Sequence, residues 1–140
     1  MSTPSENKQL LSTIFDALAK GDARPFTDAL ADDLRWRFAG EWSWVRDWGA
    51  SKREVRENLL RPLMAQFSDY RASAEEILAD GDRVVVRARA SATTVRGDDY
   101  RQAYCYVFRV NDGRIAEVTE YCDTALVERV LELPAEPARS

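Results

Sequence analysis

Near the N-terminus, apolar residues recur at the spacing of an α-helix, and they predict a helix over residues 4–20. Thr3 and Glu6 have the spacing of a capping box, which starts such a helix, and Gly21 is a typical stop. The side chains that form one apolar stripe on it are Leu11, Ile14, Phe15 and Leu18. This stripe is expected to face the core.

A second helix and a short strand follow. Asp22 can cap a helix that runs to about Leu30. From Leu34 to Phe38 apolar and charged residues alternate, which is typical of a strand with one buried face, and Trp36 lies on that face. The chain therefore begins with a helical hairpin and one strand.

A third helix is predicted after residue 50. Ser51 and Glu54 form a second capping box. Pro62 lies inside the helical pattern, and because proline lacks an amide donor and crowds the preceding turn, we expect a kink or a break near Arg61. The apolar residues of this pattern recur every four positions: Val55, Leu59, Leu63 and Phe67.

After Tyr70 the chain has the pattern of an antiparallel meander, with turn sequences rich in Gly, Asp and Asn between strands. A last helix is expected over 123–133, with Asp123 as its cap, and the polar tail 134–140 is expected to be disordered. The predicted strands are 71–79, 83–95, 100–110 and 114–122.

Helices first and a meander last predict an α+β fold, with the helices packed on one face of a strongly curved antiparallel sheet that encloses an internal pocket. The 140 residues fit one domain, 1–133. The strand from Ala103 to Val110 carries bulky residues on both faces. Because a partner usually covers a large apolar face, we expect a homodimer through the sheet.

Composition narrows the chemistry. With 24 acidic and 20 basic residues the net charge is -4, which argues against nucleic acid as a partner. The sequence has no transmembrane stretch and no signal peptide, so a cytoplasmic protein is expected. There is no histidine and only two cysteines, so neither a zinc site nor a histidine-activated nucleophile is available. No nucleotide or flavin cofactor is expected, because no glycine-rich phosphate loop is present. No metal is expected either, because the aspartates and glutamates are dispersed without the spacing of metal ligands.

All four tryptophans lie between residues 36 and 48. Each indole can bury about 150 to 250 Å², so this segment packs on something: either it anchors the helices to the sheet, or it forms an aromatic wall of a ligand pocket. The residues expected to contact an apolar ligand are Trp36, Phe38, Trp42, Trp44, Trp48, Phe67 and Tyr106.

Glu120 is the candidate general acid or base. Alternation along the last strand groups it with Val118 and Cys122. If that face lines the pocket, burial raises the pKa of the carboxyl toward neutrality, where proton transfer is most useful. The structural alternative is an ion pair with Arg87 or Arg89, or a hydrogen bond to Tyr104 or Tyr106, that fixes the pocket floor.

Tyr104 and Tyr106 offer hydroxyl donors that could polarise a substrate oxygen, and Tyr100 is a weaker candidate at a strand end. Packing alone also explains tyrosines in strands.

The order of elements, Gly21-Asp22 after the first helix, the turn 111–115 and the segment 120–126 together resemble the SnoaL-like, ketosteroid-isomerase-like branch of the nuclear transport factor 2-like superfamily. The resemblance covers about residues 5–131. It implies a conical fold with a pocket between sheet and helices, and a dimer in most members.

Family catalytic residues are mostly absent. The ketosteroid isomerase tyrosine and two aspartates match Phe15, Phe38 and Tyr106, so that mechanism is not expected. In limonene-epoxide-hydrolase-like members, an Asp-Arg-Asp set matches Ser91, Arg89 and Glu120. A tyrosine and an asparagine of the same members match Trp36 and Phe38. The resemblance thus leaves Arg89 to orient Glu120 or a water.

Three hypotheses follow. The chain is a cofactor-independent isomerase, hydratase or hydrolase for an apolar cyclic compound, with Glu120, Tyr104 and Arg89 as catalytic residues. Alternatively it is a non-catalytic ligand sensor or carrier, or a dimerisation module whose cavity is filled by its own tryptophans.

Overall fold

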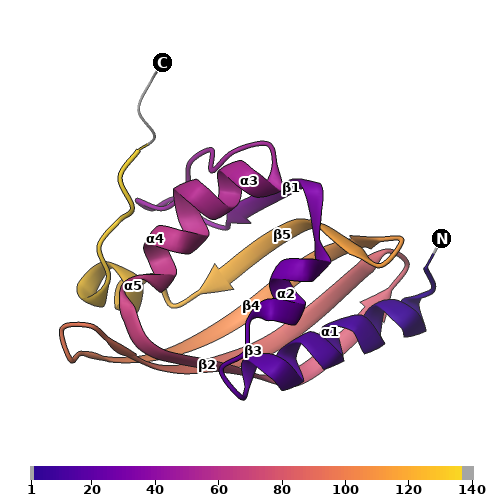
Figure 1. The fold of residues 1–140 in the computed structure, drawn as a ribbon, viewed down its shortest axis with the longest axis horizontal. Helices are drawn as coiled ribbons and strands as arrows, with labels where there is room; N and C mark the ends of the chain where they lie inside the picture. Colours follow the sequence, from indigo (N-terminus) through magenta and orange to yellow (C-terminus); the bar gives the residue numbers. More distant parts are fainter. Residues whose placement is uncertain (1, 137–140) are drawn as a thin grey trace.

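Helices cover one side of a curved five-stranded sheet in the computed structural model, which describes residues 2–136 (Figure 1). This arrangement confirms the predicted α+β fold with N-terminal helices and a curved sheet. The helical elements are α1 (Pro4–Leu18), α2 (Arg24–Ala29), α3 (Lys52–Val55), the π-helical turn η1 (Arg56–Leu60), α4 (Arg61–Met64) and α5 (Thr124–Val130). The strands are β1 (Leu30–Phe38), β2 (Phe67–Asp80), β3 (Arg83–Thr94), β4 (Asp99–Asn111) and β5 (Arg114–Cys122).

The sheet order is β1-β5-β4-β3-β2. The meander β2 to β5 is antiparallel as expected, but β1 pairs with β5 in parallel, so the sheet is mixed. The pairing sets Phe38 opposite Glu120 and Trp36 opposite Val118. The edge strand therefore brings Trp36 and Phe38 close to the candidate acid.

A two-residue turn connects β4 to β5 and sets the pairing of the residues next to it. Asp112 and Gly113 both have positive φ, 49° and 76°, as a type I′ turn requires. Its right-handed twist matches the flanking strands, and next to the turn Val110 pairs with Ile115. The register then shifts by one residue at a β-bulge, and beyond this shift Tyr106 lies opposite Glu120.

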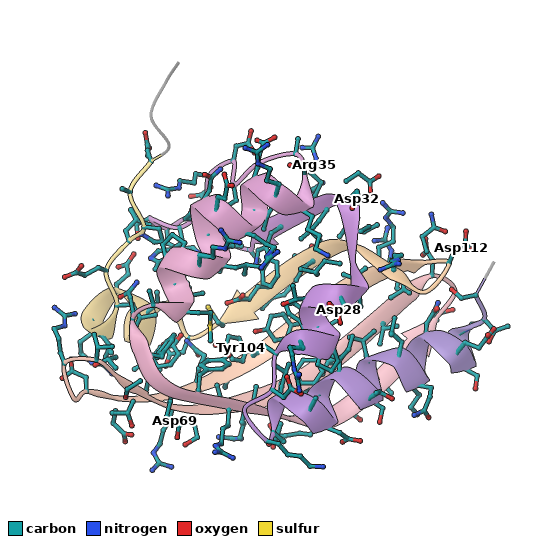
Figure 2. The ribbon with its side chains drawn as sticks, viewed as in Figure 1. Asp28, Asp32, Arg35, Asp69, Tyr104 and Asp112 are labelled. Atoms are coloured by element: carbon teal, nitrogen blue, oxygen red, sulfur yellow. The ribbon has the colours of Figure 1, made fainter. Side chains whose placement is uncertain are left out.

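Alternation in β3 and β4 sorts the side chains onto two faces. Even-numbered residues from Val84 to Thr94 and from Tyr100 to Val110 are buried beneath the helices, while odd-numbered ones are exposed or half-buried. Figure 2 shows the result: Tyr104 lies inside, whereas labelled charged side chains such as Asp28 and Asp69 point outward.

The irregularity expected near Arg61 is present as a π-helical turn, and the helix continues through Pro62 without a break. This turn, η1, precedes the proline, and the Arg61 amide donates to the Arg56 carbonyl across the wider π turn. Proline has no amide hydrogen to donate, and its ring crowds the preceding turn. The wider π turn displaces the backbone just before Pro62, so the helix can continue through the proline.

After α5 the chain is held against the body of the protein. The Gln66 side chain brackets the backbone of Glu132, donating to its carbonyl and accepting from its amide, both at 2.8 Å. Pro134 is buried, and its carbonyl accepts from Arg46 at 2.7 Å. The remainder of the predicted tail, 137–140, lies outside the described residues.

Candidate active site

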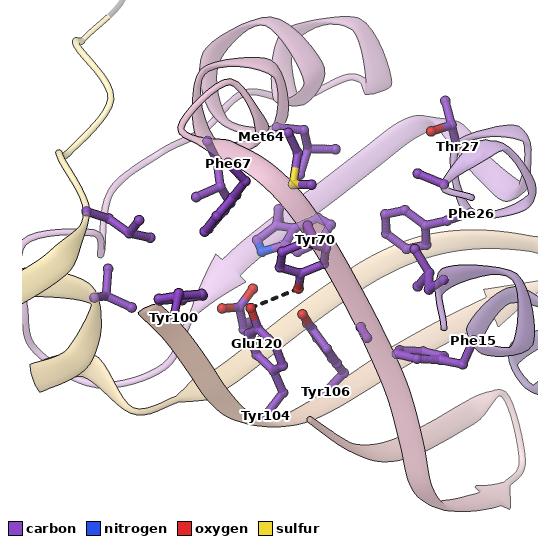
Figure 3. A pocket seen from close by; sticks show the side chains of 18 of the residues that line it. Phe15, Phe26, Thr27, Met64, Phe67, Tyr70, Tyr100, Tyr104, Tyr106 and Glu120 are labelled. Atoms are coloured by element: carbon purple, nitrogen blue, oxygen red, sulfur yellow. Dashed lines mark hydrogen bonds between the residues drawn. The ribbon is translucent and has the colours of Figure 1, made fainter. Parts of the chain in front are cut away.

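A cavity of about 180 Å³ lies between the concave side of the sheet and the helices (Figure 3). Aromatic and aliphatic side chains from α1, α2, α4, α5 and all strands but β3 form its walls. Among residues 2–136, no arginine and no lysine contributes to its lining. The polar groups are concentrated at one end, where Glu120 and four tyrosines converge: Tyr70, Tyr100, Tyr104 and Tyr106.

Glu120 projects from β5 into this cavity and is only 7% exposed. Burial raises the pKa of its carboxyl to about 8, against smaller opposing effects of Cys122 and Trp36. The protonated acid therefore predominates at neutral pH. The candidate general acid of the sequence is thus buried and neutral.

Trp36 presents a donor to the same end. Its indole N–H is buried without a hydrogen-bond partner, yet the ring lies near enough to Glu120 to lower the pKa of that carboxyl. The contact lacks the geometry of a full hydrogen bond. An unpaired buried donor costs free energy that a ligand oxygen can recover.

The tyrosines form a connected set. The hydroxyls of Tyr70 and Tyr104 are hydrogen-bonded at 2.9 Å, and the rings of Tyr104 and Tyr106 stack with centroids 4.8 Å apart. Burial raises the pKa of all four cavity tyrosines well above the ordinary value. They remain neutral hydroxyls that can donate to a substrate oxygen.

Arg89 does not belong to this site. Alternation places it on the opposite face of the sheet, where it is 70% exposed and its Nε contacts Glu75 at 3.2 Å. Ser91 is exposed on that same face. The expectation that Arg89 orients Glu120 is therefore wrong, and so is the alternative of an ion pair between Glu120 and either Arg87 or Arg89, since both arginines face outward.

The tryptophans divide into two groups. Trp36 and Trp44 line the cavity, whereas Trp42 and Trp48 do not, which corrects the expectation for the latter two. Trp42, Trp44 and Trp48 pack around Phe38 with ring centroids 5.6 to 5.9 Å away. The segment thus anchors a core cluster and contributes one further ring to the cavity wall, without filling it.

Sequence reasoning placed Glu120, Tyr104, Tyr106, Trp36, Phe38, Trp44 and Phe67 in the site, and all seven line the cavity. It missed Tyr70, because the predicted strand began one residue later, at position 71. The signal that could have found it is alternation: Ala72 and Tyr70 share the inner face of β2.

No three acidic or cysteine side chains within residues 2–136 are arranged to hold a metal ion. None of the helices described could span a membrane, given their lengths and polarity.

Comparison with known proteins places the fold. The sequence profile of the SnoaL-like domain matches residues 11–118. Among curated proteins, none matches this chain in sequence. An LEH-like epoxide hydrolase from M. tuberculosis is 25% identical, with a TM-score of 0.68 over 91% of this chain and 90% of that one.

Two further solved structures share the fold. A nuclear transport factor 2-like protein of unknown function from Burkholderia pseudomallei is 24% identical, with a TM-score of 0.74 over 94% of this chain and 98% of that one. A candidate SnoaL-like polyketide cyclase from Jannaschia is 17% identical, with a TM-score of 0.71 over 98% and 99% of the two chains. These matches agree with the conical fold that the resemblance implied. The profile match spans most of the chain, which therefore belongs to the SnoaL-like domain family.

Proposed function

We propose that the chain binds a small, uncharged, largely apolar cyclic molecule in the cavity and transforms it by acid–base chemistry without a cofactor. The observation that carries this proposal is the Glu120 carboxyl, buried at the hydroxyl-rich end of an apolar cavity that no cationic side chain of the described residues lines. A buried acid without a counter-charge is costly to the fold, and such groups are concentrated at functional sites.

The chemistry follows from the protonation states. Glu120 carries its proton at neutral pH and acts as a general acid toward a ring oxygen or carbonyl, with Tyr104 polarising the same oxygen. Isomerisation, water addition and hydrolysis of a strained ring all fit this pair of groups. The similarity to an epoxide hydrolase supports this reaction class.

The test is the variant Glu120→Gln, assayed against a panel of neutral cyclic ketones and epoxides. Turnover of any substrate found is expected to fall about 100-fold, while binding changes little, because glutamine keeps size and neutrality but cannot transfer the proton. For the wild type, kcat/KM is expected to decrease as the pH rises through about 8, where Glu120 loses its proton.

Arg89→Ala is the matched control and is expected to retain full activity, since that side chain lies on the outer face. Unchanged turnover in Glu120→Gln with intact binding would show instead a non-catalytic sensor or carrier.

We also propose that two copies of the chain associate through the outer face of the sheet. An apolar strip crosses it and is bordered by arginine–glutamate pairs such as Arg83–Glu117 at 3.3 Å. A face with both charge signs around an apolar centre can be complementary to itself. The strip consists of Ala103, Cys105, Val107 and Tyr121.

The cytoplasmic location expected from the sequence stays a prediction.

Sedimentation velocity at micromolar concentration is expected to show a dimer. Tyr121→Glu is expected to produce a monomer, because it sets a charge into the strip where Tyr121 is 51% exposed. Val95→Glu changes an exposed apolar residue in the turn between β3 and β4 and serves as the control. A wild-type monomer contradicts the proposal.

A further inference from the structure

A buried glutamine lies behind the tyrosines of the cavity. Gln102 follows Tyr100 by two positions on β4, so both side chains point to the inner face, and Gln102 is only 1% exposed. Tyr100 lines the cavity, but Gln102 does not. Its amide uses every hydrogen-bonding position in contacts with Tyr100, Ala103 and Asp123.

The orientation of this amide is determined by the backbone. Its Oε1 accepts from two groups that can only donate, the N–H of Ala103 at 3.0 Å and the N–H of Asp123 at 2.8 Å. Its Nε2 donates to the Asp123 carbonyl at 3.1 Å, a group that can only accept. A flipped amide would set donor against donor and acceptor against acceptor, so Nε2 must face Tyr100.

The direction of the next hydrogen bond follows. Nε2 donates to the Tyr100 hydroxyl at 3.0 Å, so the tyrosine oxygen is the acceptor and its own hydrogen must point elsewhere. That hydrogen is retained at physiological pH, because burial raises the pKa of Tyr100 far above neutrality. The neighbouring acceptors are the Tyr104 hydroxyl, which is bonded to Tyr70, the carboxyl of Glu120 at the same end of the cavity, and any ligand oxygen in the cavity.

We propose that Gln102 is a positioning residue that fixes Tyr100 as a hydrogen-bond donor to an uncharged ligand oxygen, such as that of a ketone or an ether. The inference rests on the proposed function in one respect, that the ligand occupies this cavity. Anionic ligands are disfavoured, because carboxylate or phosphate would find no cation among the lining residues.

The same amide also sets the spacing between donor and acid. Asp123, held by both its N–H and its carbonyl, lies three residues after Glu120. It caps α5 because its Oδ1 accepts a hydrogen bond from the Leu126 N–H at 3.2 Å. Gln102 thus connects Tyr100 to the end of the strand that carries Glu120. A ligand oxygen placed by Tyr100 is thereby held at a constant position relative to the carboxyl.

The first experiment uses two probes of nearly equal size, 2-tetralone and its hydrocarbon analogue tetralin, titrated calorimetrically into the full chain. The wild type is expected to bind the ketone about tenfold more tightly than the hydrocarbon, since only the ketone accepts a hydrogen bond. Tyr100→Phe is expected to abolish that preference while leaving tetralin binding unchanged.

The second experiment tests Gln102 itself. In Gln102→Glu an acceptor oxygen replaces the Nε2 donor, so the Tyr100 hydrogen turns toward residue 102 and away from the cavity. The variant is expected to lose ketone preference as fully as Tyr100→Phe does. When Gln102→Glu is added to Tyr100→Phe, ketone affinity is expected to fall by less than about a further twofold. Equal weakening of both probes, or full ketone preference in Gln102→Glu, overturns the positioning role.

If Gln102→Glu does not fold, the side-chain amide resonance of Gln102 in the wild type decides. It is expected to shift on addition of 2-tetralone and to stay in place with tetralin; no shift with the ketone overturns the proposal. Equal binding of both probes by the wild type also overturns it and leaves the acid–base function intact. Binding of neither probe counts against the cavity as a ligand site, and so against both proposals.

Discussion

Glu120→Gln is expected to remain stable at alkaline pH while the wild type loses stability. In the wild type the carboxyl has a pKa of about 8 when folded and the ordinary value of 4.5 when unfolded. Between these values the folded state holds a proton that the unfolded state releases, so stability falls as the pH rises. At about 1.4 kcal/mol per unit, the loss from pH 5 to pH 8.5 is on the order of 4 kcal/mol.

The measurement is urea unfolding of both proteins at pH 5, 7 and 8.5. Glutamine cannot ionise, so the difference in unfolding free energy should grow with pH in favour of the variant. Glu117→Gln is the control on the same strand: hydrogen bonds from Arg109 and Arg83 outweigh its burial and lower the pKa of Glu117. That variant should gain nothing at high pH. A pH-independent difference for Glu120→Gln would contradict the buried, neutral acid.

Trp48→Ala is expected to destabilise the protein by about 3 to 5 kcal/mol, the usual cost of removing a fully buried indole. Trp48 is 1% exposed, its Nε1 donates to the Trp44 carbonyl at 3.0 Å, and the Arg46 guanidinium lies 3.9 Å from its ring centroid. The substitution removes packing, a hydrogen bond and a cation–π contact together.

Trp42→Ala provides the comparison, and guanidinium unfolding of both variants is the measurement. Trp42 also packs on Phe38 and donates to a carbonyl, that of Ala39 at 2.9 Å, but its ring is only half-buried. It should cost less than half as much as Trp48→Ala. Similar losses of stability in both variants would contradict the expectation that the buried Trp48 contributes more to folding than the half-buried Trp42.

The features predicted best from the sequence are those that depend on residues close together in the chain, such as helix caps and turns. The first helix begins at the expected capping box, with Thr3 and Glu6 exchanging bonds of 3.0 and 3.1 Å. The turn Asp112-Gly113 and the strands around it were predicted for the same reason. The parallel pairing of β1 with β5 was not, because residues so far apart in sequence leave no local signal of their contact.

The error over Arg89 came from register. Val84, Val85 and Val86 are all apolar, so the start of β3 does not show which parity is buried. The following residues carry the missing signal: arginine alternates with alanine, and only alanine fits beneath the tyrosines of β4 without a buried charge. This alternation predicts Arg89 on the outer face of the sheet, whereas the match to the epoxide hydrolase residues placed it in the pocket.

Within the site, the single carboxylate was found because an acid among apolar residues is conspicuous in any strand pattern. The roles of Tyr70 and Gln102 were not visible, since each depends on a partner from another strand or a helix corner.

The bracket that Gln66 forms on Glu132 offers a route to protein engineering. Because the Gln66 side chain contacts only main-chain atoms of Glu132, these two hydrogen bonds do not depend on which side chains flank Glu132. Leu131, one residue earlier, contributes to the chamber wall. Substitutions at position 131 can therefore resize the cavity while the Gln66–Glu132 hydrogen bonds stay in place, at a cost in packing because Leu131 is buried in the core.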